Sequence, residues 1–552
     1  MAATVTRLAA AAGFTVDWPE WAINTFVGIG LACTVLAIIQ ALIGGPESSG
    51  DRDGAGGCTS PGGSKTAGSA KQLARFRRFQ LTYLAPFLTV MLSDWLQGTN
   101  MYTLYQSYDV NVGALFLTGF SSSAVFGTFL GHFVDRFGRR AGCMTFCVLE
   151  LVINALEHFP SMPLLLAGRV LGGMSTSLLF SAFESWMVSE HRRRGFPEDW
   201  LASTFSFCTV GNGIVAIVAG VVAQLAADRL GDIGPFQVAL VLTAAALAML
   251  FAWTENYGAG HGPSAASGSS STPSQGTAAA AEAAAARGNG KEAVKAAAAG
   301  AARAPPKPAA NGHAGAPSNG GNGHGDGGGN GRSSSHGESC GISGGGGGMA
   351  AGVAAAWRCV KSDPRVLLLG LVQSLFEGAM YTFVFMWVPT LQGVAPGGKL
   401  PTGLVFSSFM VCITAGGMLV PTALRVVSVE AGSCAVFALA AAAMAAPAFA
   451  HDLPTVLGAC LVLETCVGAF FACAGLMRSK YLPDDLQGSI MNLFRLPLNV
   501  LVVVGTLLTD HAAPPVVFGV VSLWFAAAAL LQARLWATAG AAAVARDKPK
   551  QE

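Results

Sequence analysis

Two arginines lie inside long apolar runs of this sequence. Arg495 stands in NLFRLPLNVLVVVGTLL, which begins at Asn492, and Arg169 stands in GRVLGG, which begins at Gly168. An arginine at bilayer depth costs roughly 3 kcal/mol on insertion scales and is rarely kept there without a partner or a function. Guanidinium groups present planar, paired N–H donors to oxyanion oxygens. We predict that the two arginines, one from each half of the sequence, face one substrate across a shared cavity, and that this substrate is a small tetrahedral dianion. The alternative is that each arginine pairs with a carboxylate and only braces the helices.

Carboxylates also lie within apolar runs. Asp94 in MLSDWLQGTN and Glu377 in QSLFEGAMYT fall in corresponding stretches of two similar halves, Glu464 lies in LVLETCVG, and Glu184 in SAFESWM is nearer a helix end. A carboxyl group at low dielectric can gain or lose a proton near neutral pH, which proton-coupled anion uptake requires. We predict a role in proton coupling, or as arginine counter-ion, for Asp94, Glu377, Glu464 and Glu184.

Uncharged polar residues share helix faces with these charges. Gln97 follows Asp94 by three positions and Gln373 precedes Glu377 by four, spacings that place both members of each pair on one helix face. Asn492, Arg495 and Asn499 form an i, i+3, i+7 stripe. The predicted substrate-binding residues are Arg495, Arg169, Gln97, Asn100, Gln373, Asn492 and Asn499.

The composition is that of a membrane protein. Of 552 residues, 52% are hydrophobic and 12% charged, and the mean hydropathy is +0.50, whereas soluble domains carry about 25% charged residues. A net charge of +2 without a basic stripe argues against nucleic-acid binding. We find no CxxC, no metal-ligand cluster, no phosphate-cradling loop and no nucleophile–base constellation, so we expect no enzyme activity, metal or cofactor.

Apolar runs of about 20 residues identify membrane-spanning helices. The sequence predicts an all-α membrane protein with thirteen spans, in the order one, six, linker, six. The predicted spans are 21–43, 80–106, 112–133, 142–159, 162–188, 201–227, 235–254, 364–391, 403–424, 431–450, 454–477, 487–509 and 515–537. The predicted segments are 1–79 (anchor helix and basic loop), 80–257 (first bundle), 258–355 (disordered Gly/Ala/Ser-rich linker), 356–537 (second bundle) and 538–552 (tail).

Basic residues predict the orientation. KQLARFRRF, DRFGRR, HRRR, RSKY and the tail ARDKPKQE all fall on one side of the predicted spans, together with the linker. Since lysine and arginine concentrate on the cytosolic side, we expect the linker and C-terminus in the cytosol and the N-terminus outside. We expect a multi-pass protein of the plasma membrane, with the first span a retained anchor; a cleaved signal peptide is the alternative.

The two groups of six spans resemble each other. LQGTNMYTLY, from Leu96, is similar to FEGAMYTFVF, from Phe376, and TGFSSSAVFG, from Thr118, is similar to LVFSSFMVC, from Leu404. Paired six-helix repeats are a transporter plan with the substrate near the midplane.

GHFVDRFGRRAG, which runs from Gly131 to Gly142, lies between the second and third spans of the first bundle. It resembles the signature loop of the major facilitator superfamily, and the resemblance implies a gating role for Gly131, Asp135, Arg136, Gly138 and Arg139. Asp135 can accept hydrogen bonds from a helix N-terminus or pair with an arginine. A turn with solvated charges is the alternative.

Longer strings narrow the resemblance. GRVLGGMSTSLLFSAFESWMVSEH, VLLLGLVQSLFEGAMYTFVFMWVP, VFSSFM and NLFRLPLN are similar to the eukaryotic molybdate-anion transporters. The resemblance implies uptake of molybdate by alternating access, with the lipid bilayer and protons as partners. The long linker departs from that family. Alternatives are a carrier for sulfate, an organic anion or a sugar, or a transporter-like sensor that moves no solute.

Overall fold

The computed structural model describes residues 18–43, 63–126, 130–257, 349–483 and 486–547, and residues 3, 4 and 7 near the N-terminus. In these ranges the secondary structure is helical, without β-strands. The predicted linker lies almost wholly outside them.

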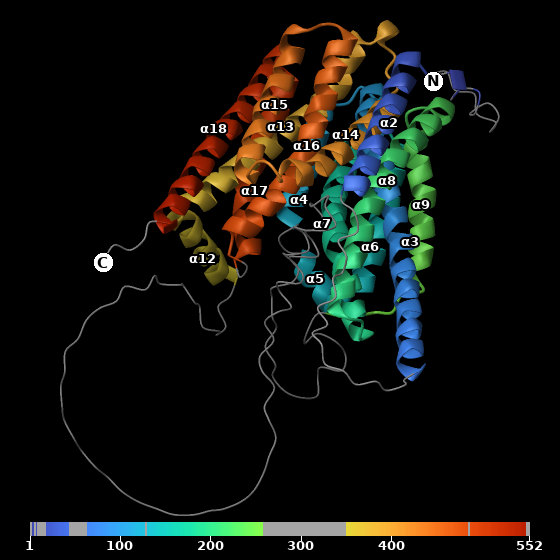
Figure 1. Cartoon of the computed structure of the whole chain (residues 1–552). Helices are drawn as coiled ribbons and strands as arrows, with labels where there is room; N and C mark the ends of the chain where they lie inside the picture. The colour runs from blue at the N-terminus through green and yellow to red at the C-terminus, as the bar shows by residue number, and fades with distance from the viewer. Residues whose placement is uncertain are drawn as a thin grey trace, which may run out of the picture.

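A first group of helices follows the N-terminal helix α2 (Glu20–Ile43). Its members, green and blue in Figure 1, are α3 (Gly63–Ser107), α4 (Val112–Phe126), α5 (Leu130–Phe137), α6 (Arg139–Leu156), α7 (Met162–Arg193), α8 (Glu198–Leu230) and α9 (Gly234–Leu250). They pack through the pairs α3–α8, α3–α9, α4–α7, α6–α7 and α6–α9. The core contains Trp186 and Trp253, whose rings stack with centroids 3.7 Å apart.

The second group comes after the undescribed segment. It contains α12 (Met349–Ser362), α13 (Pro364–Val394), the 3₁₀ turn η1 (Pro396–Gly398), α14 (Thr402–Ala423), α15 (Val429–Phe449), α16 (Leu453–Tyr481), α17 (Gln487–His511) and α18 (Pro514–Asp547). In its core Phe376 stacks on Phe470, with centroids 3.9 Å apart. Helix α12 was not predicted, and it begins at Met349, inside the range assigned to the linker.

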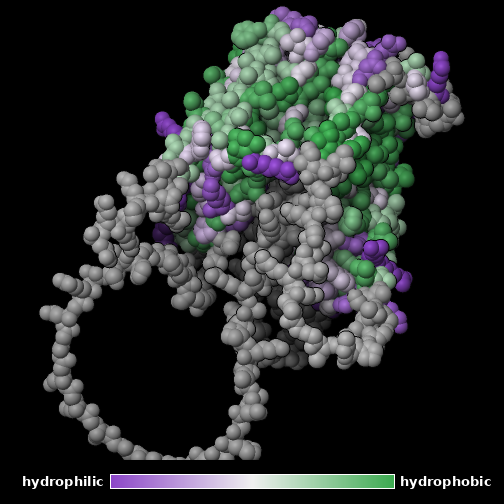
Figure 2. Space-filling view, in the orientation of Figure 1, coloured by the Kyte–Doolittle hydropathy of each residue, from purple (hydrophilic) through white to green (hydrophobic). Residues whose placement is uncertain are grey.

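Many of these helices are long enough to span a membrane. Among the described residues, eight are long and apolar enough to cross a bilayer, namely α2, α7, α8, α13, α14, α15, α16 and α18, and shorter apolar helices cover Val112–Phe126, Gly234–Leu250 and Leu493–Thr509. On the face in Figure 2, hydrophobic residues cover the middle of the helices and hydrophilic residues gather mostly toward their ends.

Local signals explain where several helices begin. Asp363 and Asp452 each accept a hydrogen bond from a main-chain N–H of the following first turn, from Arg365 and Thr455 respectively. Such caps satisfy N–H groups that have no partner within the helix. Pro364 and Pro454 follow these caps, at positions where proline costs no helical hydrogen bond.

The two groups meet along two seams. Helix α8 packs on α14, and α4 on α17. At the first seam Gly220 and Gly403 bring the backbones together, and Ser407 donates to the main-chain oxygen of Ile217 at 2.8 Å. Small residues permit such close packing between membrane helices. Helix α2 lies mainly against α14, beside this seam (Figure 1).

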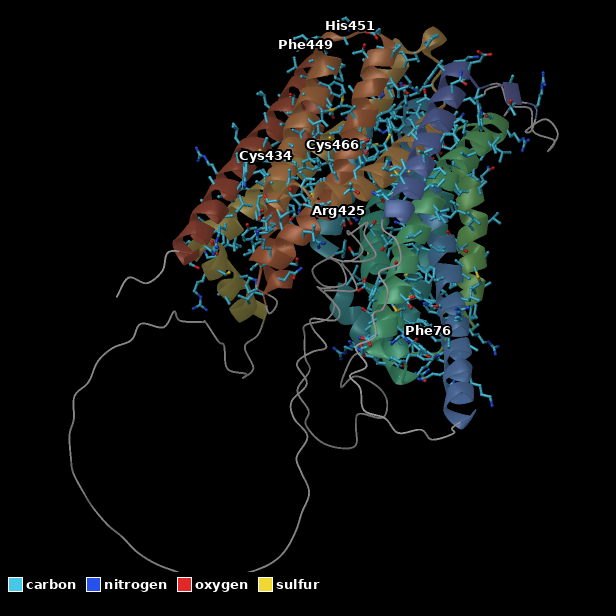
Figure 3. All side chains as sticks on the ribbon, in the orientation of Figure 1. Phe76, Arg425, Cys434, Phe449, His451 and Cys466 are labelled. Carbon is cyan, nitrogen blue, oxygen red and sulfur yellow. The ribbon has the colours of Figure 1, made fainter. Side chains whose placement is uncertain are left out.

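The molecule has two ends, which we name by their residues. The signature end holds α5 and the start of α6, where the N–H of Arg139 donates to the oxygen of Asn256. The far end holds the α3–α4, α6–α7 and α15–α16 loops. In Figure 3, Phe449 and His451 mark the far end, and Phe76 lies toward the signature end.

Candidate functional site

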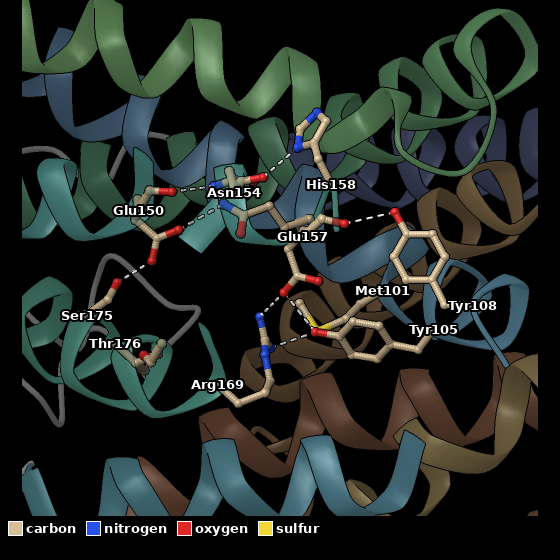
Figure 4. Close-up of polar contacts among 12 residues, drawn as sticks. Met101, Tyr105, Tyr108, Glu150, Asn154, Glu157, His158, Arg169, Ser175 and Thr176 are labelled. Carbon is tan, nitrogen blue, oxygen red and sulfur yellow. Dashed lines mark hydrogen bonds and ion pairs between the residues drawn. The ribbon is translucent and has the colours of Figure 1, made fainter. Parts of the chain in front are cut away.

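Arg169 lies on α7, eight residues into the helix from the far end, and is tied to Glu157, the residue that ends α6. Its Nη2 donates to Oε1 of Glu157 at 2.9 Å. The same carboxylate oxygen accepts the hydroxyl of Tyr105 at 2.8 Å. The Glu157 side chain is 1% exposed and that of Arg169 is 11% exposed. Figure 4 shows this buried pair.

The remaining contacts of Arg169 are weak for a guanidinium. Nη1 lies 2.9 Å from the thioether sulfur of Met101, and the guanidinium carbon lies 5.8 Å from the centre of the Tyr105 ring. Nε is buried and has no hydrogen-bond partner among the described residues. The guanidinium therefore has donor capacity that Glu157 does not use.

Glu150 lies about two helical turns before Glu157 on α6 and is the centre of a second polar cluster. Its carboxylate accepts hydrogen bonds from Gln97 at 3.0 Å and from Ser175, and its main-chain oxygen accepts one from Asn154 at 2.8 Å. Asp94 lies close enough for its charge to interact with that of Glu150. Gln97, predicted as a substrate ligand, is 5% exposed and uses its amide for this carboxylate.

Arg495 has a different setting on α17. Its side chain is exposed, and its charge interacts with Glu377 and Tyr381 on α13. Arg478, on α16 and 3% exposed, also acts electrostatically on Glu377. Gln373 donates to Oε1 of Glu377 at 2.9 Å, as the predicted shared face requires.

The neighbouring residue Phe494 fixes the position of Arg495 along α17. The buried ring of Phe494 fits against Gly370 of α13, where a Cβ atom would overlap the ring. The hydroxyl of Ser374 donates to the main-chain oxygen of Phe494 at 3.0 Å. These contacts fix the register of α17 on α13 at the position of Arg495.

Five aromatic side chains link the surroundings of the two arginines. Tyr105 contacts Phe116 with ring centroids 6.3 Å apart, and Phe116 contacts Phe385 at 4.9 Å. Phe120 contacts Phe385 at 5.8 Å and Tyr381 at 5.2 Å. We call Tyr105, Phe116, Phe120, Tyr381 and Phe385 the aromatic bridge; it joins α3 and α4 of the first group to α13 of the second.

The two arginines lie at different depths. At about 1.5 Å per residue, Arg169 is about 10 Å from the far end of α7, which starts at Met162, and Arg495 is about 12 Å from the signature end of α17, which starts at Gln487. That the two arginines face one shared cavity therefore stays a prediction. Arg169 lies over the ring of Tyr105, and the charge of Arg495 interacts with Tyr381, so each arginine is next to a different member of the aromatic bridge.

The other predicted site residues are scattered. Asn100 is 2% exposed and accepts the Thr99 hydroxyl at 3.1 Å, Asn499 is half-buried, and the side chain of Asn492 lies outside the described residues. Glu464 is 7% exposed near Cys412 and Cys460, and the half-buried Glu184 acts electrostatically on Tyr83 and Cys208.

The signature loop is fixed by a residue that the sequence did not single out. Oε1 and Oε2 of Glu255, which follows α9, accept the N–H groups of Arg140 and Ala141 at 2.8 and 3.0 Å. Gly138 has a φ of 117°, and a Cβ there would overlap this carboxylate. Arg136 is exposed and lies over Phe137. Asp135 and Gly131 belong to α5, and nothing of the Asp135 side chain is described.

A pocket of about 390 Å³ opens at the far end between the two groups of helices. It is lined by polar residues of α3, α8, α13 and α14, among them Asn100, Thr103, Gln224, Asp228 and Gln392. Two of its lining residues, Asp228 and Asp232, are acidic, and none is basic. Of the predicted substrate-binding residues, Asn100 lines this pocket, and neither Arg169 nor Arg495 is among its lining residues.

Three charged residues that contact or act on the candidate site residues were not singled out from the sequence. Glu157 occurs in NALEHFPSM, Arg478 in LMRSKY and Glu255 in AWTENY, all at helix ends. Charges at helix ends are ordinary in membrane proteins, so their spacing gave no signal. For Glu157 the only available signal was its place twelve residues before Arg169, across a short turn.

The chain matches one family model and several named proteins. The family is described as sugar transporters with 12 transmembrane segments, and its model matches residues 61–279 and 334–470. A protein named molybdate-anion transporter from Xenopus tropicalis is 29% identical over 80% of this chain and 81% of its own length. One of the same name from Takifugu rubripes is 28% identical over 78% and 79%.

Solved structures share the fold. The POT family transporter PepTSo has a TM-score of 0.55 at 11% identity and covers 84% of this chain and 98% of its own. The nucleoside transporter NupG has a TM-score of 0.53 at 11% identity over 83% of this chain and 98% of its own. Because the family model matches more than half of the 552 residues, the chain belongs to this transporter family of the major facilitator superfamily.

Proposed function

We propose that this protein carries molybdate across a membrane by alternating access between its two groups of helices. The observation that carries the proposal is Arg495, an exposed arginine within an apolar helix, whose charge interacts with Glu377 and Tyr381 on the facing helix α13. The name of the relatives, molybdate-anion transporter, supplies the substrate.

The chemistry of the site supports an oxyanion. A guanidinium stays charged at any physiological pH and offers parallel N–H donors that match two oxygens of a tetrahedral anion. Arg495 would hold the anion on the signature side of the aromatic bridge, and Arg169 would hold it on the far side. The substrate then passes between them when the bridge opens. Asn499, Asn492, Asn100 and Gln373 remain proposed additional ligands.

The architecture that we propose has thirteen spans. Helices α3–α9 and α13–α18 would form two bundles of six spans, with α4 and α5 together making one span, and α2 would be an extra anchor. The bundles would occupy 80–257 and 356–537, joined by a cytosolic linker, in the plasma membrane. Support comes from the helix packing, which is mostly within each group, while the two groups meet where α8 packs on α14 and α4 on α17.

Proton coupling is assigned to the embedded carboxylates. Asp94 and Glu377 are the first candidates, since each lies in the first long helix of its group and beside a further charge, Glu150 and Arg495 respectively. Glu464 and Glu184 are further candidates. The signature loop would act as a hinge, with Glu255 holding α6 to the end of α9.

Uptake into vesicles tests the proposal. Purified protein in proteoliposomes should accumulate molybdate, measured by elemental mass spectrometry, with saturation, and above protein-free vesicles. Tungstate and sulfate should compete, and glucose should not. Saturable sugar counterflow without molybdate flux would overturn the assignment.

Sugar transport is the second candidate, and the far-end pocket favours it. Amides and hydroxyls of Asn100, Thr103 and Gln392 line this pocket with two carboxylates, and such groups hydrogen-bond to sugar hydroxyls. The description of the matched family points the same way. The competition arm with glucose separates the two candidates.

A further inference from the structure

Glu157, the ion-pair partner of Arg169, is held by several hydrogen bonds. Its carboxylate accepts the Tyr105 hydroxyl, and its main-chain oxygen accepts the Tyr108 hydroxyl at 2.8 Å. Tyr105 lies in the last turn of α3 and Tyr108 directly follows that helix, whereas Glu157 caps the C-terminus of α6. The side chain is 1% exposed, so it is fixed in place before any partner binds.

The ion pair that Glu157 makes is incomplete on both sides. Its Oε2 is buried and has no hydrogen-bond partner among the described residues, and the same is true of Nε of Arg169. Nη1 of Arg169 faces a thioether, which is a weak acceptor. Buried polar atoms are nearly always satisfied in folded proteins, so orphaned ones indicate a site that is completed by something else.

The unused donors define what completes the site. Arg169 offers N–H groups and has a single oxygen ligand among the contacts described, Oε1 of Glu157. An incoming oxyanion could supply the further oxygens and would be repelled by the carboxylate. Anion and carboxylate would therefore compete for one guanidinium.

We propose that Glu157 is a positioning residue that competes with the transported oxyanion for Arg169. This inference rests on the proposed function. Before substrate arrives, Glu157 neutralises Arg169 and holds its guanidinium over the Tyr105 ring. When an oxyanion binds, it displaces Oε1, and when it leaves, Glu157 takes the guanidinium back.

The competition between Glu157 and the anion would help Arg169 to release the anion. A dianion bound to an uncompensated, buried arginine would dissociate slowly, because charge-assisted hydrogen bonds are strong when they are shielded from water. A tethered carboxylate beside the site offsets this strength. It lowers affinity and raises turnover, which is a combination that a purely structural salt bridge would not produce.

The test compares Glu157→Gln with Glu157→Asp. Glutamine retains the shape and can still accept from Tyr105, but it removes the competing charge; aspartate retains the charge. We expect Glu157→Gln to bind molybdate about tenfold more tightly, a change of about 1.4 kcal/mol, and to lower the maximal uptake rate severalfold. Glu157→Asp should restore affinity and rate toward the wild type.

Equilibrium dialysis of purified protein against molybdate gives the affinity, and proteoliposome uptake gives the rate. Unchanged or weaker binding in a monodisperse Glu157→Gln protein would overturn the inference. In an Arg169→Ala background, Glu157→Gln should raise affinity less than it does in the wild-type background, because only the repulsion between carboxylate and anion is then removed and no guanidinium is contested.

A second variant decides the matter if Glu157→Gln fails to fold. Tyr105→Phe removes one donor from the carboxylate and leaves its charge, which makes Glu157 a stronger competitor. Molybdate binding should weaken about threefold, whereas Tyr108→Phe, which touches only the main-chain oxygen, should bind as the wild type does; equal affinities for both would refute the competition.

The two proposals fail in different ways. Binding that responds to Glu157 without any wild-type flux would overturn transport and keep the competition. Molybdate flux together with an affinity that is the same in Glu157→Gln and wild type would keep transport and overturn the competition. A wild-type protein that binds no molybdate would overturn both proposals.

Discussion

Arg169 and Arg495 could both be identified from the sequence, because a guanidinium within an apolar run is costly and stands out. Their surroundings could not. Glu157 lies at the end of α6, where a carboxylate raises no question, and only the packing of α6 on α7 brings it to Arg169. The same holds for Gln97, whose partner Glu150 is on another helix. Contacts between helices are set by three-dimensional packing, which a single sequence does not specify.

Glu377 is the residue at which we propose that anion binding and proton transfer are linked. Its carboxylate interacts with Arg495 and Arg478 and accepts from Gln373. We expect Glu377→Gln to remove the stimulation of molybdate uptake by an inward proton gradient, because the amide cannot titrate. The measurement is uptake at equal and unequal pH across the vesicle membrane.

The control for this variant is Glu190→Gln, on α7 at the signature end, whose carboxylate pairs with Arg193 and Arg194 away from Arg495. It should keep the response to the gradient. Persistent stimulation in Glu377→Gln would assign coupling to another carboxylate.

At the scale of the helices, hydropathy predicted existence and approximate bounds well. The predicted span 364–391 corresponds to α13 at Pro364–Val394, and 431–450 to α15 at Val429–Phe449. Hydropathy did not predict α12. This short helix exposes Trp357 on one face and buries Ala356 and Val360 on another, so its composition is that of neither a membrane span nor a linker. Hydropathy also gave no information on how closely helices cross.

The crossing of α14 and α16 provides a matched test. A Cβ at Gly468 would overlap the main-chain oxygen of Ile413, whereas Gly458, on the same helix α16, has nothing within 4 Å of that position. We expect Gly468→Ala to destabilise the protein by roughly 1–3 kcal/mol, because the backbones must separate. The measurement is the midpoint of thermal unfolding in detergent.

Gly458→Ala is the control and should be neutral or slightly stabilising, since alanine favours helix. Equal midpoints for the two variants would show that the α14–α16 crossing is looser than described.

At the scale of the whole molecule, the repeated sequence strings predicted two related groups of helices. That the groups meet where α8 packs on α14 and α4 on α17 was learned only from the structure. That Arg169 and Arg495 face one shared cavity stays a prediction. In the structure Arg169 lies toward the far end of α7 and Arg495 toward the signature end of α17, and the aromatic bridge links their surroundings. Depth along a helix was estimated from apolar runs alone, and these do not say where the facing helix presents its aromatic residues.

Sidedness is a prediction about the whole chain. Basic residues gather at the signature end, as in Arg192, Arg193 and Arg194 at the end of α7. We expect an epitope inserted near residue 300, or at the C-terminus, to react with antibody only after cells are permeabilised. An epitope at the N-terminus should react on intact cells.

If the linker epitope reacts with antibody on intact cells, the linker lies outside the cell and the predicted orientation is wrong.

The most direct measurement is molybdate binding and uptake by Arg495→Gln beside Arg425→Gln. Arg425 lies just beyond α14 and serves as the matched arginine outside the proposed path. Loss of a charge-assisted contact to a dianion should weaken binding at least about tenfold, or about 1.4 kcal/mol, and abolish uptake at low molybdate, with Arg425→Gln unaffected. Wild-type affinity and uptake in a correctly folded Arg495→Gln protein would contradict the account.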